Sequence, residues 1–376
     1  MNQKLIRTST VPTSLKTFLN GSFEALMEKY DLVLVSSPGK ELDELRDKYG
    51  VKIIGVPMER RMSPLKDLKS LWGLIKVFHK EKPYMVHSMT PKAGLLCMMA
   101  AWITRVPRRV HTFTGLVWPT ATGFSRKILM ATDWLTCACA THVIPEGEGV
   151  MNDLRQVTKK PMRVLGYGNV RGVDMEYWCR KNADAEKYQQ LRREDRFTFL
   201  FVGRIVRDKG INELAEAFKQ LRERYENVRL LLVGRFEDKL DPISEESRAF
   251  LESCSDVEYL GEQRGADLLA CYAASDCFVF PSYREGFPNT VLEAGAMDLP
   301  SIVTDINGSR EIIKEGKNGL IVPSKNVPEL LKAMERMVGN GELREKMASK
   351  ARQMVGDRFE QGFVRKCLLD FYDEIG

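Results

Sequence analysis

Hydrophobic residues occur along this chain in short, nearly continuous runs, and longer stretches with helical spacing separate the runs. The runs span residues 4–10, 30–37, 51–57, 85–89, 108–115 and 141–146, and then 197–205, 228–236, 257–261, 277–282, 300–305 and 318–323. Valine, leucine, isoleucine and phenylalanine dominate the second set, which is typical of strands buried on both faces of a parallel sheet. Segments such as 63–82 and 210–225 read as helices. This alternation predicts an α/β fold built on doubly wound parallel sheets.

The length of the chain divides this pattern into two domains. A single hydrophobic core seldom serves more than about 250–300 residues, and this chain has 376. The stretch 164–174 is rich in glycine and suits a hinge. We therefore expect Rossmann-like domains over residues 1–170 and 171–355, followed by an amphipathic helix within 356–376. Such domains bind ligands at the carboxyl ends of their strands, so two that face each other form a cleft.

Composition indicates an ordinary globular protein of a reducing compartment. No segment has the roughly 18 consecutive apolar residues of a membrane span, and the apolar run 94–103 reads as a buried helix. The first ten residues contain no apolar signal core, which predicts a cytoplasmic location. The eight cysteines form no Cys-x-x-Cys pair, and the four histidines show no metal spacing. We expect reduced core thiols, no metal and no cofactor.

Charge is distributed unevenly between the two halves. Residues 1–170 carry 25 Lys and Arg against 14 Asp and Glu, whereas residues 171–376 carry 32 against 37. A basic first half suits an anionic partner such as a phosphorylated substrate, a membrane surface or nucleic acid, and it is also compatible with a solvated basic face that has no partner. The absence of any recognisable RNA- or DNA-binding motif argues against nucleic acid.

Two cations follow the first strand of the second half. Gly203 permits a tight turn after this strand, and Arg204 and Lys209 come before the helix that begins near residue 211. An arginine fork and a lysine point charge together suit a diphosphate. An ordinary basic surface turn is the alternative.

The stretch 277–297 places a second anion-binding element nearby. It reads as a strand, a loop and a helix, with Pro288 in the first helical turn. The free N–H groups of Asn289, Thr290 and Val291 would then point a partial positive charge at an anion. We expect a diphosphate between this helix start and the two cations.

Two carboxylates of the same stretch have separate tasks. Glu285 and Glu293 lie eight residues apart, roughly 12 Å if the segment were helical, so they do not form one catalytic pair. A carboxylate offers two acceptor oxygens to the two donors of a vicinal diol. Glu293 can hold a ribose and Glu285 the hydroxyls of a second sugar. Glu293 could instead be a solvated helix residue, but Ala-Gly-Ala-Met follows it and indicates a packed face, where an acid needs a partner.

Nearly the whole chain resembles the family 4 glycosyltransferases of GT-B fold, and the resemblance is most specific over residues 200–325. The resemblance rests on "FVGRIVRDKG", on "PSYREGFPNTVLEAGAMDLPSIVTD" with its Glu-x7-Glu motif, and on "GVD" at 172–174. The stretches "SLKTFLNG", "TPKAGLL" and "HTFTGLVW" are similar to the capsular polysaccharide and O-antigen branch, which builds bacterial surface glycans on a lipid carrier. The resemblance also implies that the C-terminal helix crosses back onto the first domain.

The resemblance implies a retaining, metal-independent transfer of a sugar from a nucleotide sugar, with uridine as the expected base. Glu285, Arg204 and Lys209 match catalytic positions of the family. Thr114, Gly115 and Lys92 are expected to lie on the acceptor or donor-sugar side of the site. Many relatives have histidine where this chain has Thr114, and strand alternation puts His111 on the opposite face. The positions that match nucleotide-sugar contacts are Gly203, Arg204, Lys209, Gly261, Gln263, Glu285, Gly286, Phe287, Asn289, Thr290 and Glu293. The resemblance also implies that the loop 261–264 lies by the base.

The expected chemistry follows from these groups. The cations and helix amides would stabilise the departing phosphate, and no metal-binding Asp-x-Asp occurs in the chain. No carboxylate is an obvious nucleophile for a double displacement, so the family's front-face attack is the expected route. A nucleotide-sugar epimerase or a phosphorylase on the same two-domain frame is the alternative.

The basic first half is expected to face the acceptor and the membrane. Cations at Arg60, Arg61, Lys66 and Lys69 alternate with Met58, Met62 and Trp72, and Arg126 and Lys127 follow later. Such a mixture suits an anionic bilayer and a lipid diphosphate head. We expect peripheral attachment to the inner face of the cell membrane, although a helix with one buried and one wet face explains residues 66–72 equally well.

Overall fold

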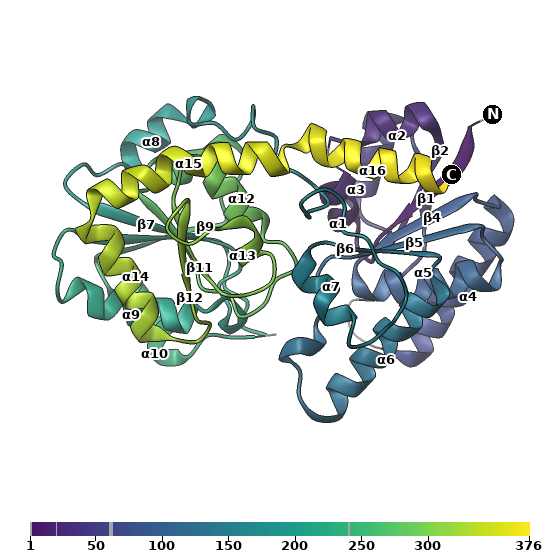
Figure 1. The fold of residues 1–376 in the computed structure, drawn as a ribbon, viewed down its shortest axis with the longest axis horizontal. Helices are drawn as coiled ribbons and strands as arrows, with labels where there is room; N and C mark the ends of the chain where they lie inside the picture. The colour runs from purple at the N-terminus through teal and green to yellow at the C-terminus, as the bar shows by residue number, and fades with distance from the viewer. Residues whose placement is uncertain (1, 20, 60–62, 240) are drawn as a thin grey trace. The chain divides into compact units, whose positions relative to one another are not determined.

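The computed structural model describes residues 2–19, 21–59, 63–239 and 241–376, which form two compact units. The first unit contains the chain up to Gly172 together with Gln361–Gly376, and the second contains Val173–Glu360. The boundary between them falls inside the glycine-rich stretch 164–174. Each unit has one parallel sheet covered by helices on both faces (Figure 1).

The first unit is built on a parallel sheet of six strands in the order β3-β2-β1-β4-β5-β6. Its strands are β1 (Gln3–Thr8), β2 (Tyr30–Ser36), β3 (Lys52–Gly55), β4 (Met85–Met89), β5 (Arg108–Phe113) and β6 (His142–Pro145). The order reverses direction after β3, so that later strands add on the other side of β1. This reversal is the feature that makes the sheet doubly wound.

Helices cover both faces of this sheet, as strand alternation requires. The helices are α1 (Pro12–Leu19), α2 (Phe23–Lys29), α3 (Lys40–Tyr49), α4 (Pro64–Glu81), α5 (Pro91–Ile103), α6 (Gly123–Cys139), α7 (Glu148–Leu154) and α16 (Gln361–Ile375), with a 3₁₀ turn η1 at Trp118–Thr120. Ile6 of β1 packs in a core with α4, α5 and α6, whereas Leu5 packs in another with α1, α2, α3 and α16. Within the apolar run 94–103, residues 94–101 are buried or half-buried in α5, as expected, whereas Trp102 and Ile103 at the end of the helix are exposed.

Helix α16 is joined to the sheet of the first unit by a buried polar cluster. The Tyr372 hydroxyl accepts a hydrogen bond from Arg7 Nη1 at 2.8 Å and is also hydrogen-bonded to His87 Nδ1. The Arg7 Nη2 group lies 3.0 Å from Met89 Sδ, and all four side chains are almost fully buried. The return of the C-terminal helix to the first domain is therefore confirmed.

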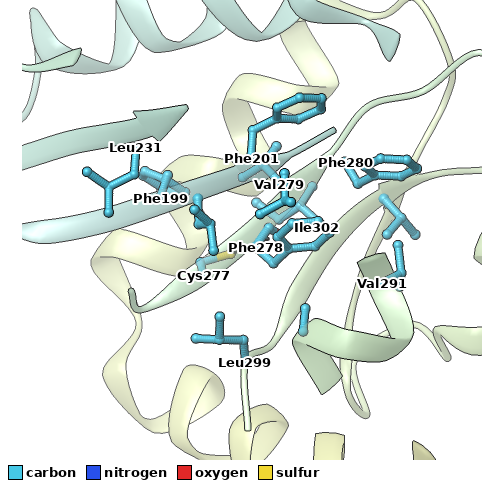
Figure 2. Packing of buried hydrophobic residues seen from close by; sticks show 14 of the residues in the cluster. Phe199, Phe201, Leu231, Cys277, Phe278, Val279, Phe280, Val291, Leu299 and Ile302 are labelled. Carbon is cyan, nitrogen blue, oxygen red and sulfur yellow. Dashed lines mark hydrogen bonds between the residues drawn. The ribbon is translucent and has the colours of Figure 1, made fainter. Parts of the chain in front are cut away.

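The second unit repeats the plan with strand order β12-β11-β10-β7-β8-β9. Its strands are β7 (Phe197–Val202), β8 (Val228–Val233), β9 (Val257–Gly261), β10 (Cys277–Phe280), β11 (Ser301–Thr304) and β12 (Gly319–Val322). Figure 2 shows the phenylalanines of β7 and β10 in the middle of its core. The rings of Phe201 and Phe280 stack with centroids 6.1 Å apart. All twelve predicted strands are thus present, and the predicted fold class is confirmed.

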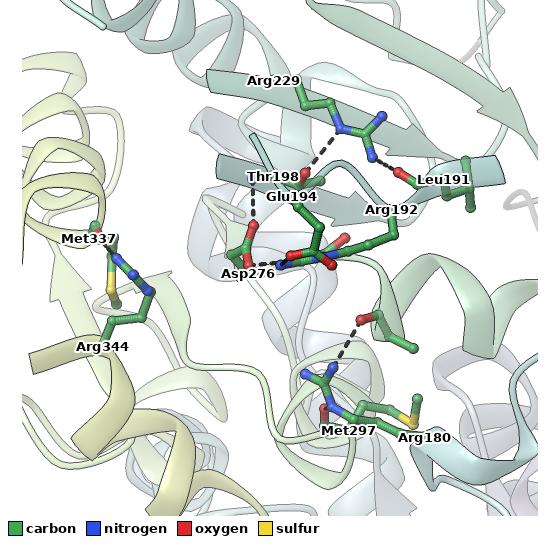
Figure 3. A network of polar contacts seen from close by, with 12 residues as sticks. Arg180, Leu191, Arg192, Glu194, Thr198, Arg229, Asp276, Met297, Met337 and Arg344 are labelled. Atoms are coloured by element: carbon green, nitrogen blue, oxygen red, sulfur yellow. Dashed lines mark hydrogen bonds and ion pairs between the residues drawn. The ribbon is translucent and has the colours of Figure 1, made fainter. Parts of the chain in front are cut away.

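Polar contacts close the amino ends of the strands in the second unit (Figure 3). Asp276 accepts a hydrogen bond from Arg192 at 2.9 Å and from the Thr198 amide at 2.8 Å, and Arg229 donates to Thr198 Oγ1 at 3.0 Å. The helical segments of this unit are η2 (Arg180–Asn182), α8 (Ala185–Leu191), η3 (Arg207–Lys209), α9 (Ile211–Arg222), α10 (Glu245–Ser253), α11 (Gly265–Ala273), α12 (Asn289–Ala296), α13 (Ser309–Ile312), α14 (Val327–Gly339) and α15 (Gly341–Phe359). The polar contacts around Asp276 and Thr198 lie at the edge of the sheet opposite the predicted site.

Candidate functional site

The predicted site lies at the carboxyl ends of the neighbouring strands β7 and β10. The loop after β7 and the loop after β10 pack directly on each other, and the Tyr283 amide donates to the Asp208 carbonyl at 2.9 Å. Gly210 makes this packing possible. Its φ is +72°, and a Cβ atom there would lie 2.0 Å from the Pro281 carbonyl oxygen. Any other residue would force the two loops apart.

Lys209 and Glu285 meet where these loops touch. The Lys209 ammonium forms an ion pair with Glu285 Oε1, and Ser282 Oγ donates to the same oxygen at 2.8 Å. The side chains of Lys209 and Glu285 are each only 16% exposed. Lys209 also lies over the Phe280 ring, 5.2 Å from its centroid. The structure therefore joins a cation and a carboxylate that the sequence assigned to different parts of one ligand.

Arg204 leaves the end of β7 on the side of β8. Its side chain is 48% exposed and donates to Glu237 Oε2 at 2.7 Å. Glu237 belongs to the segment that follows β8, so this ion pair ties two successive strand ends together. Arg204 keeps half of its surface in solvent, where a guanidinium is available to a ligand.

Glycines terminate three adjacent strands beside Arg204. Gly203, Gly234 and Gly261 follow or end β7, β8 and β9, and the Gly234 amide donates to the Gly261 carbonyl at 2.8 Å. A Cβ atom on Gly234 would lie 1.8 Å from the Gly203 oxygen. The exposed Arg235 then occupies the same place after β8 that Arg204 occupies after β7. Sequence reasoning missed Gly234 and Arg235, for which the Val-Gly-Arg triplet at the end of both strands was a signal.

The predicted loop for the base follows β9. Gln263 is half-buried, and its side-chain amide donates to the Leu260 carbonyl. Arg264 is exposed and pairs with Glu262 at 2.9 Å. The loop is thus held by its own side chains, and Gly261 and Gln263 lie at the same edge of the sheet as Gly203.

Helix α12 begins one residue later than the sequence suggested. Pro288 precedes the first helical residue, Asn289, with an extended conformation (φ −74°, ψ 107°). The Val291 amide donates to the Pro288 carbonyl at 3.2 Å. The expectation that Val291 offers a free N–H is therefore wrong, because the first turn is tightened into a 3₁₀-type bond. Thr290 remains in the first turn.

Gly286 and Phe287 fix the chain that enters α12. A Cβ atom on Gly308 would lie 2.4 Å from the Gly286 oxygen and 2.7 Å from the Phe287 Cα atom, so a neighbouring loop presses on both residues. The Phe287 ring is buried and packs on Phe359 with centroids 5.2 Å apart. Phe287 therefore anchors the loop from within the core.

Glu293 is a buried carboxylate. Its residue is only 7% exposed, and the Tyr272 hydroxyl donates to Glu293 Oε2 at 3.3 Å. Tyr272 lies on α11, and the Trp178 ring meets it edge-on at 5.6 Å. The solvated alternative for Glu293 is wrong, and the packed face predicted from Ala-Gly-Ala-Met is present. Sequence reasoning missed Tyr272, which carries no motif of its own.

A second set of polar contacts holds the two loops rigid around Lys209. The Tyr283 hydroxyl donates to Glu213 at 2.7 Å, and burial together with Glu213 raises the pKa of Tyr283. Arg284 pairs with Asp208 at 3.0 Å. Preorganised side chains of this kind lower the reorganisation needed when a charged ligand binds.

The predicted residues of the first unit lie in two places. Thr114 and Gly115 are half-buried in the loop that follows β5. Lys92, in the first turn of α5, donates to Asp67 of α4 at 2.8 Å, and the two side chains are 12% and 21% exposed. The structure therefore gives Lys92 a role in joining two helices.

His111 is a neutral core residue. Its Nδ1 atom lies 2.8 Å from Ser88 Oγ, and burial lowers the pKa of His111 to about 3. A Cβ atom on Gly94 would lie 2.3 Å from the imidazole ring, so α5 closes over it. His111 therefore has no route to a ligand near Thr114.

Two features are absent from the described ranges, a cluster of metal ligands and a membrane-spanning helix. No three His, Cys, Asp or Glu side chains of these residues converge as metal ligands would. Within the same ranges, no helix combines the length and the apolar character that crossing a bilayer requires.

Comparison with known proteins identifies the class to which this fold and site belong. Residues 182–354 match the family model for glycosyl transferases group 1, and residues 18–168 match that of the glycosyl transferase 4-like domain. The chain belongs to the family 4 glycosyltransferases of GT-B fold, and it is a glycosyltransferase.

Individual relatives refine this assignment. The chain is 34% identical to the capsular polysaccharide biosynthesis glycosyltransferase CapM of Staphylococcus aureus, over 99% of this chain and 97% of the relative. It is 29% identical to an Escherichia coli UDP-Gal:α-D-GlcNAc-diphosphoundecaprenol α-1,3-galactosyltransferase, over 82% of this chain and 80% of the relative. The crystal structure of Anabaena HepE in complex with UDP has the same fold, with a TM-score of 0.78 and 16% identity over the whole of both chains. The protein therefore lies in the branch that contains enzymes of capsular and lipid-linked glycans.

Proposed function

We propose that the protein transfers a sugar, with retention of configuration, from a UDP-sugar to a hydroxyl of a lipid-linked or growing surface-glycan acceptor. The observation that carries this proposal is the group formed by Lys209, Glu285 and Ser282 at the ends of β7 and β10, with Glu293 buried in the adjacent helix. A cation and two acids around a rigid loop suit a molecule that has a diphosphate between two sugars.

Each side chain has a proposed task. Arg204 and Lys209 bind the diphosphate, and Glu293 binds the ribose diol. Glu285, whose carboxylate lies beside the Lys209 ammonium, binds hydroxyls of the donor sugar. The loop with Gly261 and Gln263 lies beside the base. Burial strengthens the hydrogen bonds of Glu293 with a ligand, since water competes less there.

The proposed chemistry requires no metal. The bond between the anomeric carbon and the diphosphate oxygen breaks, and the diphosphate leaves with the bonding electron pair. The acceptor oxygen attacks the same face, and its proton passes to the departing phosphate. Arg204 and Lys209 stabilise the negative charge that develops on the leaving group, which is commonly the largest catalytic contribution.

The names of related proteins support the choice of substrates. UDP-Gal and diphosphoundecaprenol occur in the name of the Escherichia coli relative, and UDP is bound in the HepE structure. An acceptor on a lipid diphosphate would place the enzyme at the inner face of the cell membrane as a peripheral protein. The basic first half of the chain agrees with that location.

Binding and transfer can be separated experimentally. Titration calorimetry with UDP-, GDP- and TDP-sugars identifies the donor, and the proposal predicts that UDP-sugars bind. Transfer is then measured with a diphosphate-lipid acceptor. Conversion of the donor with no acceptor present would support an epimerase, and cleavage that requires inorganic phosphate would support a phosphorylase. Either result would overturn the proposal.

A further inference from the structure

Large apolar side chains are unevenly exposed on the described residues. Thirteen of them are exposed, and eight of these lie on the helices α4, α5 and α6 of the first unit. The most exposed are Leu65 at 85%, Phe124 at 76% and Leu68 at 64%. We define the α4–α6 face by the eight residues Leu65, Leu68, Trp72, Trp102, Ile103, Phe124, Ile128 and Trp134.

The three helices form one layer. They share a core on the same face of the sheet, and α5 packs against both α4 and α6 (Figure 1). Leu65, Leu68 and Trp72 recur at helical spacing along α4, on the side of the helix that faces away from the core. On α6 every residue from 123 to 128 is exposed. A concentration of exposed apolar side chains on one layer of a folded protein indicates an interaction site.

Charge on the same layer has a single sign at the surface. All residues of these helices are described, and their exposed Lys and Arg residues are Lys66, Lys69, Lys76, Lys80, Arg126 and Lys127. Their three carboxylates, Asp67, Glu81 and Asp133, are buried or half-buried. Lys66 is paired with Glu59 in the preceding segment. The layer therefore exposes apolar side chains among lysine and arginine residues.

This combination favours a bilayer over a protein as the partner. Interfaces between proteins are depleted in lysine, whereas lysine here alternates with the apolar residues. Tryptophan rings prefer the headgroup level of a membrane, and all three exposed tryptophans of the described residues lie on this face. The exposed Lys76 ammonium lies 5.7 Å from the centroid of the Trp72 ring, at the end of a long side chain that can extend to a lipid phosphate.

We propose that the α4–α6 face is the surface by which the protein docks on an anionic phospholipid bilayer, with Leu65, Leu68 and Phe124 entering the headgroup and acyl boundary. The inference rests on the proposed function, since a lipid-linked acceptor requires an enzyme at the membrane. Lysines 66, 69, 76 and 80 and the pair Arg126 and Lys127 contact lipid phosphates.

Binding to vesicles of phosphatidylcholine with about one third phosphatidylglycerol tests this surface. The full chain should co-sediment at low salt, and bromine-labelled acyl chains should quench its tryptophan fluorescence. The triple variant Leu65→Ser, Leu68→Ser, Phe124→Ser should lower the partition coefficient at least about tenfold. The variant Lys69→Gln, Lys76→Gln, Lys127→Gln should lose the dependence on phosphatidylglycerol.

Matched controls come from the second unit. Tyr177→Ser with Tyr259→Ser removes exposed aromatic rings, and Lys317→Gln, Lys346→Gln, Lys350→Gln removes three exposed charges. Both control variants should bind vesicles as the unaltered chain does. The proposal is wrong if the unaltered chain does not bind vesicles, or if the triple serine variant binds equally well. It is also wrong if that variant only converts an oligomer to a monomer, because the face would then join two copies.

Transfer to a water-soluble, short-chain acceptor separates this inference from the proposed function. The triple serine variant should transfer sugar to that acceptor at the unaltered rate and fail with acceptor embedded in vesicles. If the protein transfers sugar to the soluble acceptor but does not bind vesicles, the docking surface is refuted and the proposed function is kept. If vesicle binding depends on the residues of the α4–α6 face but no sugar is transferred to either acceptor, the proposed function is refuted and the docking surface is kept.

Discussion

At the scale of single residues, the two acids of the Glu-x7-Glu motif differ in burial and in partner. Glu293 is buried beside Tyr272, whereas Glu285 bonds to Lys209 at the contact of two loops. The same functional group is therefore used in two environments, and substitutions at the two positions should have different consequences.

Glu293→Gln should weaken nucleotide binding more than Glu285→Gln. Loss of a charge-assisted hydrogen bond to ribose costs about 1.5–3 kcal/mol, or roughly tenfold to hundredfold in Kd. Glu285→Gln should mainly lower kcat, because its proposed partner is the transferred sugar. Calorimetry with UDP and steady-state kinetics measure the two effects, and Glu226→Gln, exposed at the opposite edge of the sheet, is the control. Equal losses of UDP affinity would contradict the division of tasks.

Asp133 on α6 should make the stability of the first unit depend on pH. Burial raises the pKa of Asp133 to about 7, so the folded state retains a proton that the unfolded state releases near pH 4. The free energy of unfolding should therefore fall as pH rises from about 4 to 7. Asp133→Asn should remove this contribution and stabilise the protein at pH 8 by the order of a few kcal/mol. Urea unfolding of the unaltered protein and of Asp133→Asn is measured across pH. The difference between their free energies of unfolding isolates the contribution of Asp133 from that of the buried histidines. A difference that does not change with pH would contradict the prediction.

At the scale of elements, Gly210 determines whether the loops after β7 and β10 can meet. Gly210→Ala adds a Cβ 2.0 Å from the Pro281 oxygen at a φ of +72°, whereas Gly265→Ala meets nothing within 4 Å at a φ of +59°. Both substitutions carry the cost of positive φ, roughly 1–2 kcal/mol. Urea unfolding should show a larger loss for Gly210→Ala, together with weaker UDP binding. Equal losses would show that the loop contact contributes nothing.

Helix α16 should depend on one hydroxyl for its attachment to the first unit. Tyr372→Phe removes the partner of both Arg7 and His87 in a buried place. Leaving such buried polar groups unsatisfied costs about 1–3 kcal/mol. Hydrogen exchange should then accelerate in α16, while Tyr167→Phe, at an exposed ring, should leave it unchanged. Unaltered exchange in the Tyr372→Phe protein would contradict the account.

At the scale of the whole molecule, the fold could be predicted from the sequence because strands that are buried on both faces of a sheet form long apolar runs. The run 197–205 contains β7, and the run 277–282 contains β10. The burial of Glu293 was also readable, since small and apolar residues follow it. The ion pair of Lys209 with Glu285 was not, because the two residues are 76 positions apart and side-chain pairing depends on loop packing.

Other parts of the site had no sequence signal that spacing can reveal. Tyr272 reaches Glu293 from a different helix, and no periodicity marks it. The role of Lys92 beside Asp67 depends on how α4 and α5 pack. Arg60, Arg61 and Met62, which were expected to face a membrane, lie outside the described residues.

The central claim is that a nucleoside diphosphate binds at the ends of β7 and β10 through Arg204 and Lys209. Titration calorimetry with UDP on the unaltered chain and on Arg204→Gln, Lys209→Gln tests it most directly, with Lys346→Gln, Lys350→Gln as a control of equal charge change. The account predicts binding to the unaltered and control proteins and a loss of at least about hundredfold in affinity for the double variant. Absence of UDP binding to the folded protein, or equal affinity in all three proteins, would contradict it.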